Sequence, residues 1–281
     1  MASLLERGIG LWWRHWKGLL LVCLVVAVVP GLMAAVAGMA LGLLPVGLTE
    51  ALVLLLPEQL AGNSQNLTAI IARPGGWVVL LIYGALTVLS SAGMLGFLRP
   101  IVHDGRPPEA ADFVDGIRRY SGRLLVMRVL CALVLGVSGL VALAVLFLGG
   151  ALLAEWLVPL TALAAFSAGA SALMYADYAL VVEDAGAMEA VSDSVGVLRE
   201  RWREAVGATL AFFLISGIGE AVGWLLARVI AEPAGLLLSI LPVALTRGAA
   251  VSYLLVRYIE NVHRGIYRRQ GRFAIDDRKA G

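Results

Sequence analysis

Long apolar runs separated by short polar segments fill most of this chain of 281 residues. About 20 apolar residues are needed to cross the hydrocarbon core of a bilayer, which is about 30 Å thick. Each run of that length must form a helix, because lipid offers exposed backbone groups no hydrogen-bond partners. The runs predict six spans, at residues 18–44, 75–98, 124–148, 157–182, 205–230 and 233–256.

Shorter amphipathic segments precede three of these spans. In residues 188–202, apolar side chains recur at steps of three and four, which is the signature of one face of a helix. Residues 110–120 show the same pattern after Pro107 and Pro108, which suit a helix start, and residues 5–16 repeat it. We expect three interfacial helices with their apolar side towards the lipid.

A constant offset of eighty residues relates the segments at the ends of the second, fourth and sixth predicted spans, namely 97–105, 177–185 and 257–265. The same offset relates Arg119 to Arg199. The sequence therefore predicts an all-α polytopic membrane protein with six transmembrane helices in three hairpins. Each hairpin would follow a cytoplasmic interfacial amphipathic helix, and the three units would surround a pseudo-threefold axis as parallel repeats.

The repeat divides the chain into five predicted parts. The first hairpin contains a long external connection at residues 45–74. The parts are an amphipathic N-terminal helix at 1–17, hairpin one at 18–98, an interfacial helix with hairpin two at 99–182, an interfacial helix with hairpin three at 183–259, and a basic cytoplasmic tail at 260–281.

Basic residues gather on one side of the predicted spans. They crowd into residues 1–17, 99–123, 199–203 and 264–279, whereas the alternate connections contain only Arg73. Cytoplasmic segments of membrane proteins carry such an excess of Lys and Arg, so we expect a multi-pass cell-membrane protein with both termini in the cytoplasm. Cleavage of the first span as a signal peptide is an alternative that leaves the other spans in this orientation.

Composition agrees with lipid as the solvent, because 60% of residues are hydrophobic, 15% are charged and the mean hydropathy is +0.88. Cys23 and Cys131 lie within apolar runs and resemble small buried hydrophobic residues. Basic stripes interleaved with aromatic residues are missing outside the termini, which disfavours a nucleic-acid partner. Nucleotide-binding and hydrolase motifs are also missing, which disfavours an enzyme.

Two ionisable residues fall near the middle of adjacent predicted spans, Glu220 in the fifth and Arg247 in the sixth. Charges inside a membrane normally pair internally, so we expect a salt bridge that locks this hairpin. The repeat supports a second interpretation, because it aligns Arg247 with Thr87 and Ser167. These three polar sites would then ring a central cavity, in which Arg247 binds a phosphate or another anion.

Further charges lie closer to the cytoplasmic ends of the spans. Asp177 and Arg257 occupy equivalent positions of the repeat, and Arg128 enters its span at similar depth. We expect these three residues to form a structural cluster of salt bridges.

His103, Glu183 and His263 also share one position of the repeat. Two histidines and a carboxylate are a ligand set that zinc and non-haem iron use. A metal site would form only if the three side chains converge within bonding distance. We therefore expect no cofactor, with a metal ion at these residues as the alternative.

One stretch of the sequence resembles a known family. The residues that carry this resemblance are Tyr175-Ala176-Asp177-Tyr178, Glu183, Ala190, Ser194, Leu198, Arg201 and Trp202. This stretch is similar to the six-helix membrane domain associated with glycerophosphodiester phosphodiesterases and with related uncharacterised bacterial membrane proteins. The resemblance covers about thirty residues. It implies the six-helix fold and a domain without chemistry of its own.

These patterns favour a non-catalytic integral membrane module, which would bind lipid, act as a scaffold or serve as an accessory subunit. We expect anionic membrane lipids and protein subunits as partners. A transporter or channel for an anion or small solute, using Arg247 and Glu220, is one alternative. A membrane enzyme with a His/Glu metal site is another.

Overall fold

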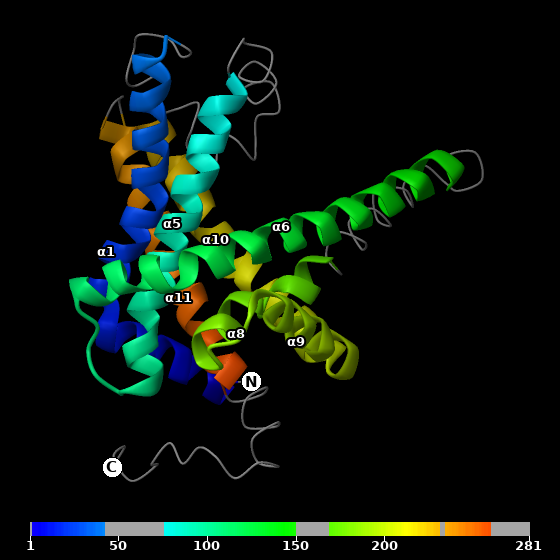
Figure 1. Ribbon diagram of the computed structural model, residues 1–281. Coiled ribbons are helices and arrows are strands. Elements are labelled where there is room, and N and C mark those ends of the chain that lie inside the picture. The colour runs from blue at the N-terminus through cyan, green and yellow to red at the C-terminus, as the bar shows by residue number, and fades with distance from the viewer. Residues whose placement is uncertain (1, 43–75, 150–168, 231–233, 260–281) are drawn as a thin grey trace.

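The computed structural model describes residues 2–42, 76–149, 169–230 and 234–259, and its regular structure there is entirely helical (Figure 1). The helices are α1 (Ala2–Ala40), α5 (Gly76–His103), α6 (Ala110–Gly149), α8 (Ala176–Val182), α9 (Ala187–Glu200), α10 (Trp202–Val229) and α11 (Ala234–Arg257). The prediction of an all-helical chain is confirmed for these residues.

Five helices are long and apolar enough to cross a membrane: Glu6–Ala40, Gly76–His103, Ala110–Val141, Trp202–Val229 and Leu238–Arg257. These helices indicate a membrane protein. Most of the predicted fourth span, residues 157–182, lies outside the described residues, and its end forms the shorter apolar helix Gly169–Val182. The count of six is therefore not confirmed.

Large apolar side chains cover the outside of the described helices. Leu133 on α6 is 61% exposed and Leu214 on α10 is 68% exposed. A soluble protein of this kind would aggregate, whereas lipid tails solvate such side chains as well as a protein core does.

Glycines bring the helices together at close range. A Cβ atom on Gly219 of α10 would lie 1.9 Å from Thr246 Oγ1 of α11, and one on Gly223 would lie 2.7 Å from the Ser239 carbonyl oxygen. The backbones of α10 and α11 therefore approach as closely as small-residue contacts between membrane helices allow. A similar contact joins α5 to α6, where Gly96 faces Gly116.

The last turns of α5 and α11, the first half of α6 and the short helix α8 all contribute to one cluster of buried apolar residues. Tyr120, Tyr175 and Tyr258 are completely or almost completely buried there. The rings of Tyr175 and Tyr258 lie 5.7 Å apart. In Figure 1, α8 and α9 lie next to each other, below α6 in this view.

The structure differs among the three predicted interfacial helices in whether a break separates each of them from the following span. The backbone of α1 kinks at His15, close to the expected border between residues 17 and 18. Arg201 leaves the helical conformation and separates α9 from α10. The expected border near residue 123 is wrong, because α6 continues unbroken for 40 residues. It contains no proline, and the glycines near this border do not interrupt its hydrogen bonds.

The threefold arrangement is also not confirmed. It requires α5 and α11 to pack against each other at the centre, but α1 packs against both of them and lies between them. Two glycines of α1 provide the space, since Gly8 touches the backbone of Tyr253 and Gly18 touches the ring of Phe97. In Figure 1, α6 crosses in front of α1 and α5 instead of running alongside them.

Candidate functional site

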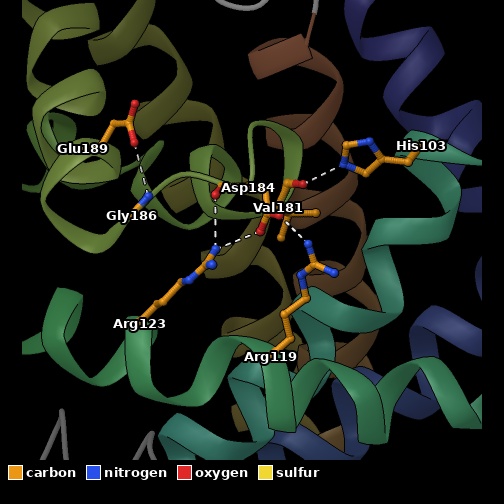
Figure 2. Close-up of polar contacts among 7 residues, drawn as sticks. All are labelled: His103, Arg119, Arg123, Val181, Asp184, Gly186 and Glu189. Atoms are coloured by element: carbon orange, nitrogen blue, oxygen red, sulfur yellow. Dashed lines mark hydrogen bonds and ion pairs between the residues drawn. The ribbon is translucent and has the colours of Figure 1, made fainter.

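The turn between α8 and α9 carries a group of polar contacts that connects elements distant in the sequence. α8 ends at Val182, and Asp184 then adopts a left-handed backbone conformation with a φ of 53°. Aspartate tolerates this conformation better than most residues. Its carboxylate points at α6, where Arg119 and Arg123 lie one helical turn apart (Figure 2).

Both arginines bind Asp184. Arg119 donates from Nη2 to Oδ2 of the carboxylate. Arg123 donates from Nη1 to Oδ1 at 2.8 Å and to the Asp184 carbonyl oxygen at 3.1 Å. One acidic residue thus fixes two arginines that lie 61 and 65 residues earlier in the sequence.

Two further hydrogen bonds complete this group. His103, the last residue of α5, bonds through Nε2 to the Val181 carbonyl oxygen at 2.9 Å, so Nε2 carries the proton. The Gly186 N–H donates to Glu189 Oε2 at 3.3 Å and caps α9. The group links α5 and α6 to α8 and to the turn that leads into α9, and we call it the Asp184 junction: His103, Arg119, Arg123, Val181, Asp184, Gly186 and Glu189 (Figure 2).

Solvent reaches the charges of the Asp184 junction, since the side chains of Asp184 and Arg119 are 39% and 40% exposed. Partial burial by itself raises the pKa of Asp184, but the hydrogen bonds and charges of Arg119 and Arg123 outweigh it and lower this pKa. Exposed ion pairs stabilise a protein by about 1 kcal/mol or less. The ion pairs of the Asp184 junction therefore contribute little to stability, although they connect α6 to the turn after α8.

The predicted metal ligands have other partners where the structure describes them. His103 gives its Nε2 proton to Val181, and Glu183 accepts a hydrogen bond of 2.5 Å from the hydroxyl of the buried Tyr258. His263 lies outside the described residues. Within the described ranges, His, Cys, Asp and Glu side chains form no group of three that is close enough to hold a metal ion. The metal site stays a prediction.

The three residues of the expected salt-bridge cluster separate into two groups. Arg128 of α6 and Asp177 of α8 form an ion pair of 2.7 Å. Arg257, which is 3% exposed, instead donates to the hydroxyl of Tyr253 one turn earlier in α11. The first pair links two helices, whereas the second interaction is local.

Glu220 and Arg247 do not form the expected salt bridge in the described structure. The contact between α10 and α11 uses Gly219 and Thr246, the residues immediately before them. A step of one residue turns a side chain by about 100° around a helix, so Glu220 and Arg247 leave this contact in other directions. Both side chains are exposed. Arg247 lies within electrostatic range of Tyr83 on α5.

The structure describes two of the three residues of the proposed polar ring, Thr87 and Arg247. The Thr87 hydroxyl donates to the Tyr83 carbonyl oxygen, 2.8 Å away in its own helix, which is a common way for a membrane helix to satisfy a threonine. Ser167 lies outside the described residues. The anion cavity around Arg247 therefore stays a prediction.

Sequence reasoning missed Asp184 as the centre of the site. The available signal was weak: an aspartate just after a helix, and two arginines spaced by four residues elsewhere. Each feature has an ordinary explanation at a membrane surface, and only the folded chain shows that they meet.

In comparisons with known proteins, no family model, curated protein or solved structure matches the chain.

Proposed function

We propose that this protein is a non-catalytic integral membrane module that works by binding a helix of another membrane protein against α10. The observation that carries this proposal is Glu220. It is exposed inside an apolar helix long enough to span the membrane, and its carboxylate has no ion pair or hydrogen bond within the described ranges. Acidic residues inside spans are expensive and face a partner or a polar cavity.

The surroundings of Glu220 suit a helix. Phe213, Gly217, Glu220 and Trp224 recur at steps of four, three and four, and all four are exposed. We call this stripe the Glu220 face. Nothing lies within 4 Å of the position that a Cβ atom would take on Gly217, so a second backbone can approach there. Gly219 and Gly223, which point in another direction from α10, already pack against α11.

The negative charge of Glu220 determines which kind of helix could bind to this face. A helix that carries a lysine, an arginine or another strong hydrogen-bond donor at the depth of Glu220 would satisfy the carboxylate away from water. The aromatic side chains of Phe213 and Trp224 would flank this contact above and below. A module of this kind needs no catalytic residues, which agrees with the resemblance of residues 175–202 to a membrane domain without chemistry of its own.

Site-specific photocrosslinking in native membranes tests this function. A photoreactive residue at Gly217 should give one discrete protein adduct, whereas the same residue at Leu133, exposed on α6, should give none. Glu220→Leu should abolish the adduct and Glu220→Asp should retain it. The same adducts at both positions, or an adduct that survives Glu220→Leu, would contradict the proposal. An adduct between two copies of the chain would identify its partner as itself.

We also propose that the basic segments and both termini face the cytoplasm, where anionic lipids surround them. The support is the one-sided distribution of Lys and Arg along the sequence. The transporter alternative would use Arg247 and Glu220, and the metal-enzyme alternative would also need His263, which lies outside the described residues.

A further inference from the structure

A polar cavity of about 450 Å³ opens between the end of α5 and the first turns of α6. Arg99 lines it from α5, and Arg118 and Tyr120 line it from α6. Its volume falls within the range of about 300–1,000 Å³ that is typical of small-molecule sites. The cavity adjoins the Asp184 junction through Arg119 but takes its other polar groups from elsewhere.

The close crossing of α5 and α6 explains why these residues meet. A Cβ atom on Gly96 would lie 2.2 Å from the Cα atom of Gly116, so the two backbones touch at this point. Arg99 follows Gly96 by three residues and Tyr120 follows Gly116 by four, which places each about one helical turn from the crossing. The two side chains therefore line the same space from two helices.

Two buried hydrogen-bond donors in this lining have no partner within the described structure. They are Nε of Arg99 and the hydroxyl of Tyr120, whose side chain is completely buried. The carboxylate of Asp112 is already occupied, because it accepts from Arg106 at 2.9 Å and 2.5 Å and from the Glu109 N–H at 2.7 Å. Buried donors in native proteins are nearly always satisfied, and an acceptor bound beside Arg99 and Tyr120 would satisfy these two.

We propose that this cavity binds a phosphate group, with Arg99 and Tyr120 as its hydrogen-bond donors. The planar guanidinium group of Arg99 suits phosphate oxygens. Arg118 lines the same cavity and has no ion pair among the described residues, so it adds positive charge. The apolar helix α5 ends beside the cavity at His103, and lipid phosphates lie just beyond the ends of membrane-spanning helices.

The acidic residues that line the cavity limit how much negative charge a bound ligand can carry. Four arginines and three aspartates line the cavity, so the excess of positive charge is small. Arg106 contacts both Asp104 and Asp112, at 3.4 Å and 2.5 Å, and offsets one of their two negative charges, while Asp115 remains exposed. This balance favours the single negative charge of a phosphodiester over a dianion. A lipid headgroup and a soluble phosphate share the recognised chemistry, and the headgroup carries the favoured charge.

Ligand-dependent thermal unfolding of the full chain in a maltoside detergent tests the site. The probes are short-chain phosphatidylglycerol, inorganic phosphate, and a short-chain diacylglycerol that lacks phosphorus. We expect a saturable rise of the melting temperature with phosphatidylglycerol and none with diacylglycerol. Binding should weaken about tenfold or more in Arg99→Gln, because a hydrogen bond to a charged group is lost, and severalfold in Tyr120→Phe.

Arg228→Gln on α10 is the matched control, because this arginine lies over the ring of Trp224 and has no place in the cavity; it should bind as the natural chain does. Tyr120→Phe removes a buried unpartnered hydroxyl and keeps the ring, so it decides the question even if Arg99→Gln does not fold. Binding of inorganic phosphate alone would support the site with a soluble ligand. Equal binding in all variants, or no response to either phosphate probe, would overturn the proposal, and neither result bears on the Glu220 face.

Discussion

Asp184 shows how one residue can end a helix and join two distant elements. Its positive φ turns the chain from α8 towards α9, and its short carboxylate reaches two arginines of α6 from this turn. The sequence pattern predicts the helix end near this residue. It cannot predict the arginine partners, because contacts over more than sixty residues depend on how the helices cross.

We expect Asp184→Asn to lower the melting temperature at pH 7, with a loss of about 1 kcal/mol of stability or less because solvent screens both ion pairs. The pKa of Asp184 is lowered in the folded protein, so its contribution is complete above about pH 4, the pKa of an unfolded aspartate. It disappears as the pH falls through the lower folded pKa. Thermal unfolding of both variants from pH 7 downwards measures this difference.

The control for this experiment is Asp115→Asn, since Asp115 is exposed and has no ion pair in the described structure. Its melting temperature should follow that of the natural chain at every pH. A gap for Asp184→Asn that stays constant down to pH 3 would show that the substitution acts through the backbone turn instead of the charge.

Helices as elements were predictable where periodicity or an apolar run marked them. The amphipathic pattern of residues 188–202 corresponds to α9, and Arg201 ends it. The same kind of pattern failed for residues 110–120, because it shows which face is apolar but not where a helix stops. α6 therefore joins two predicted elements into one.

Gly96→Ala tests the contact between α5 and α6. The new methyl group would lie 2.2 Å from the Gly116 Cα atom, so we expect the helices to separate and stability to fall by about 1–3 kcal/mol. Gly122→Ala on α6 is the control, because the space around Gly122 is open and alanine favours a helix by up to about 1 kcal/mol. Thermal unfolding in detergent compares them, and equal melting temperatures would contradict the contact.

At the scale of the whole molecule, the sequence predicted a helical membrane protein but not its packing. Apolar residues point to lipid and to other helices alike, so hydrophobicity does not reveal which face packs. The contacts depend on glycines such as Gly18, Gly116 and Gly219, which an apolar pattern treats as ordinary members of a span. The arrangement of α1 between α5 and α11 could not be derived from an eighty-residue spacing for this reason.

Orientation can be measured with single cysteines at Ser64, in the predicted outer connection, and at Met188, which is 68% exposed on α9. Cys23 and Cys131 are buried and should react slowly. A membrane-impermeant thiol reagent applied to intact cells should label the cysteine at position 64 only, and after lysis it should label both. Labelling of position 188 in intact cells would reverse the proposed topology.

The helix α6 is unbroken, and its crossing with α5 divides it into a short arm and a long arm. At about 1.5 Å per residue, the helix extends roughly 9 Å from Ala110 to its crossing at Gly116 and roughly 50 Å beyond it to Gly149. The ion pairs of Arg119, Arg123 and Arg128 hold α6 on the far side of this crossing. If they were released, a rod pivoting at Gly116 would enlarge a shift of the short arm about fivefold at the far end, by the ratio of the two arms.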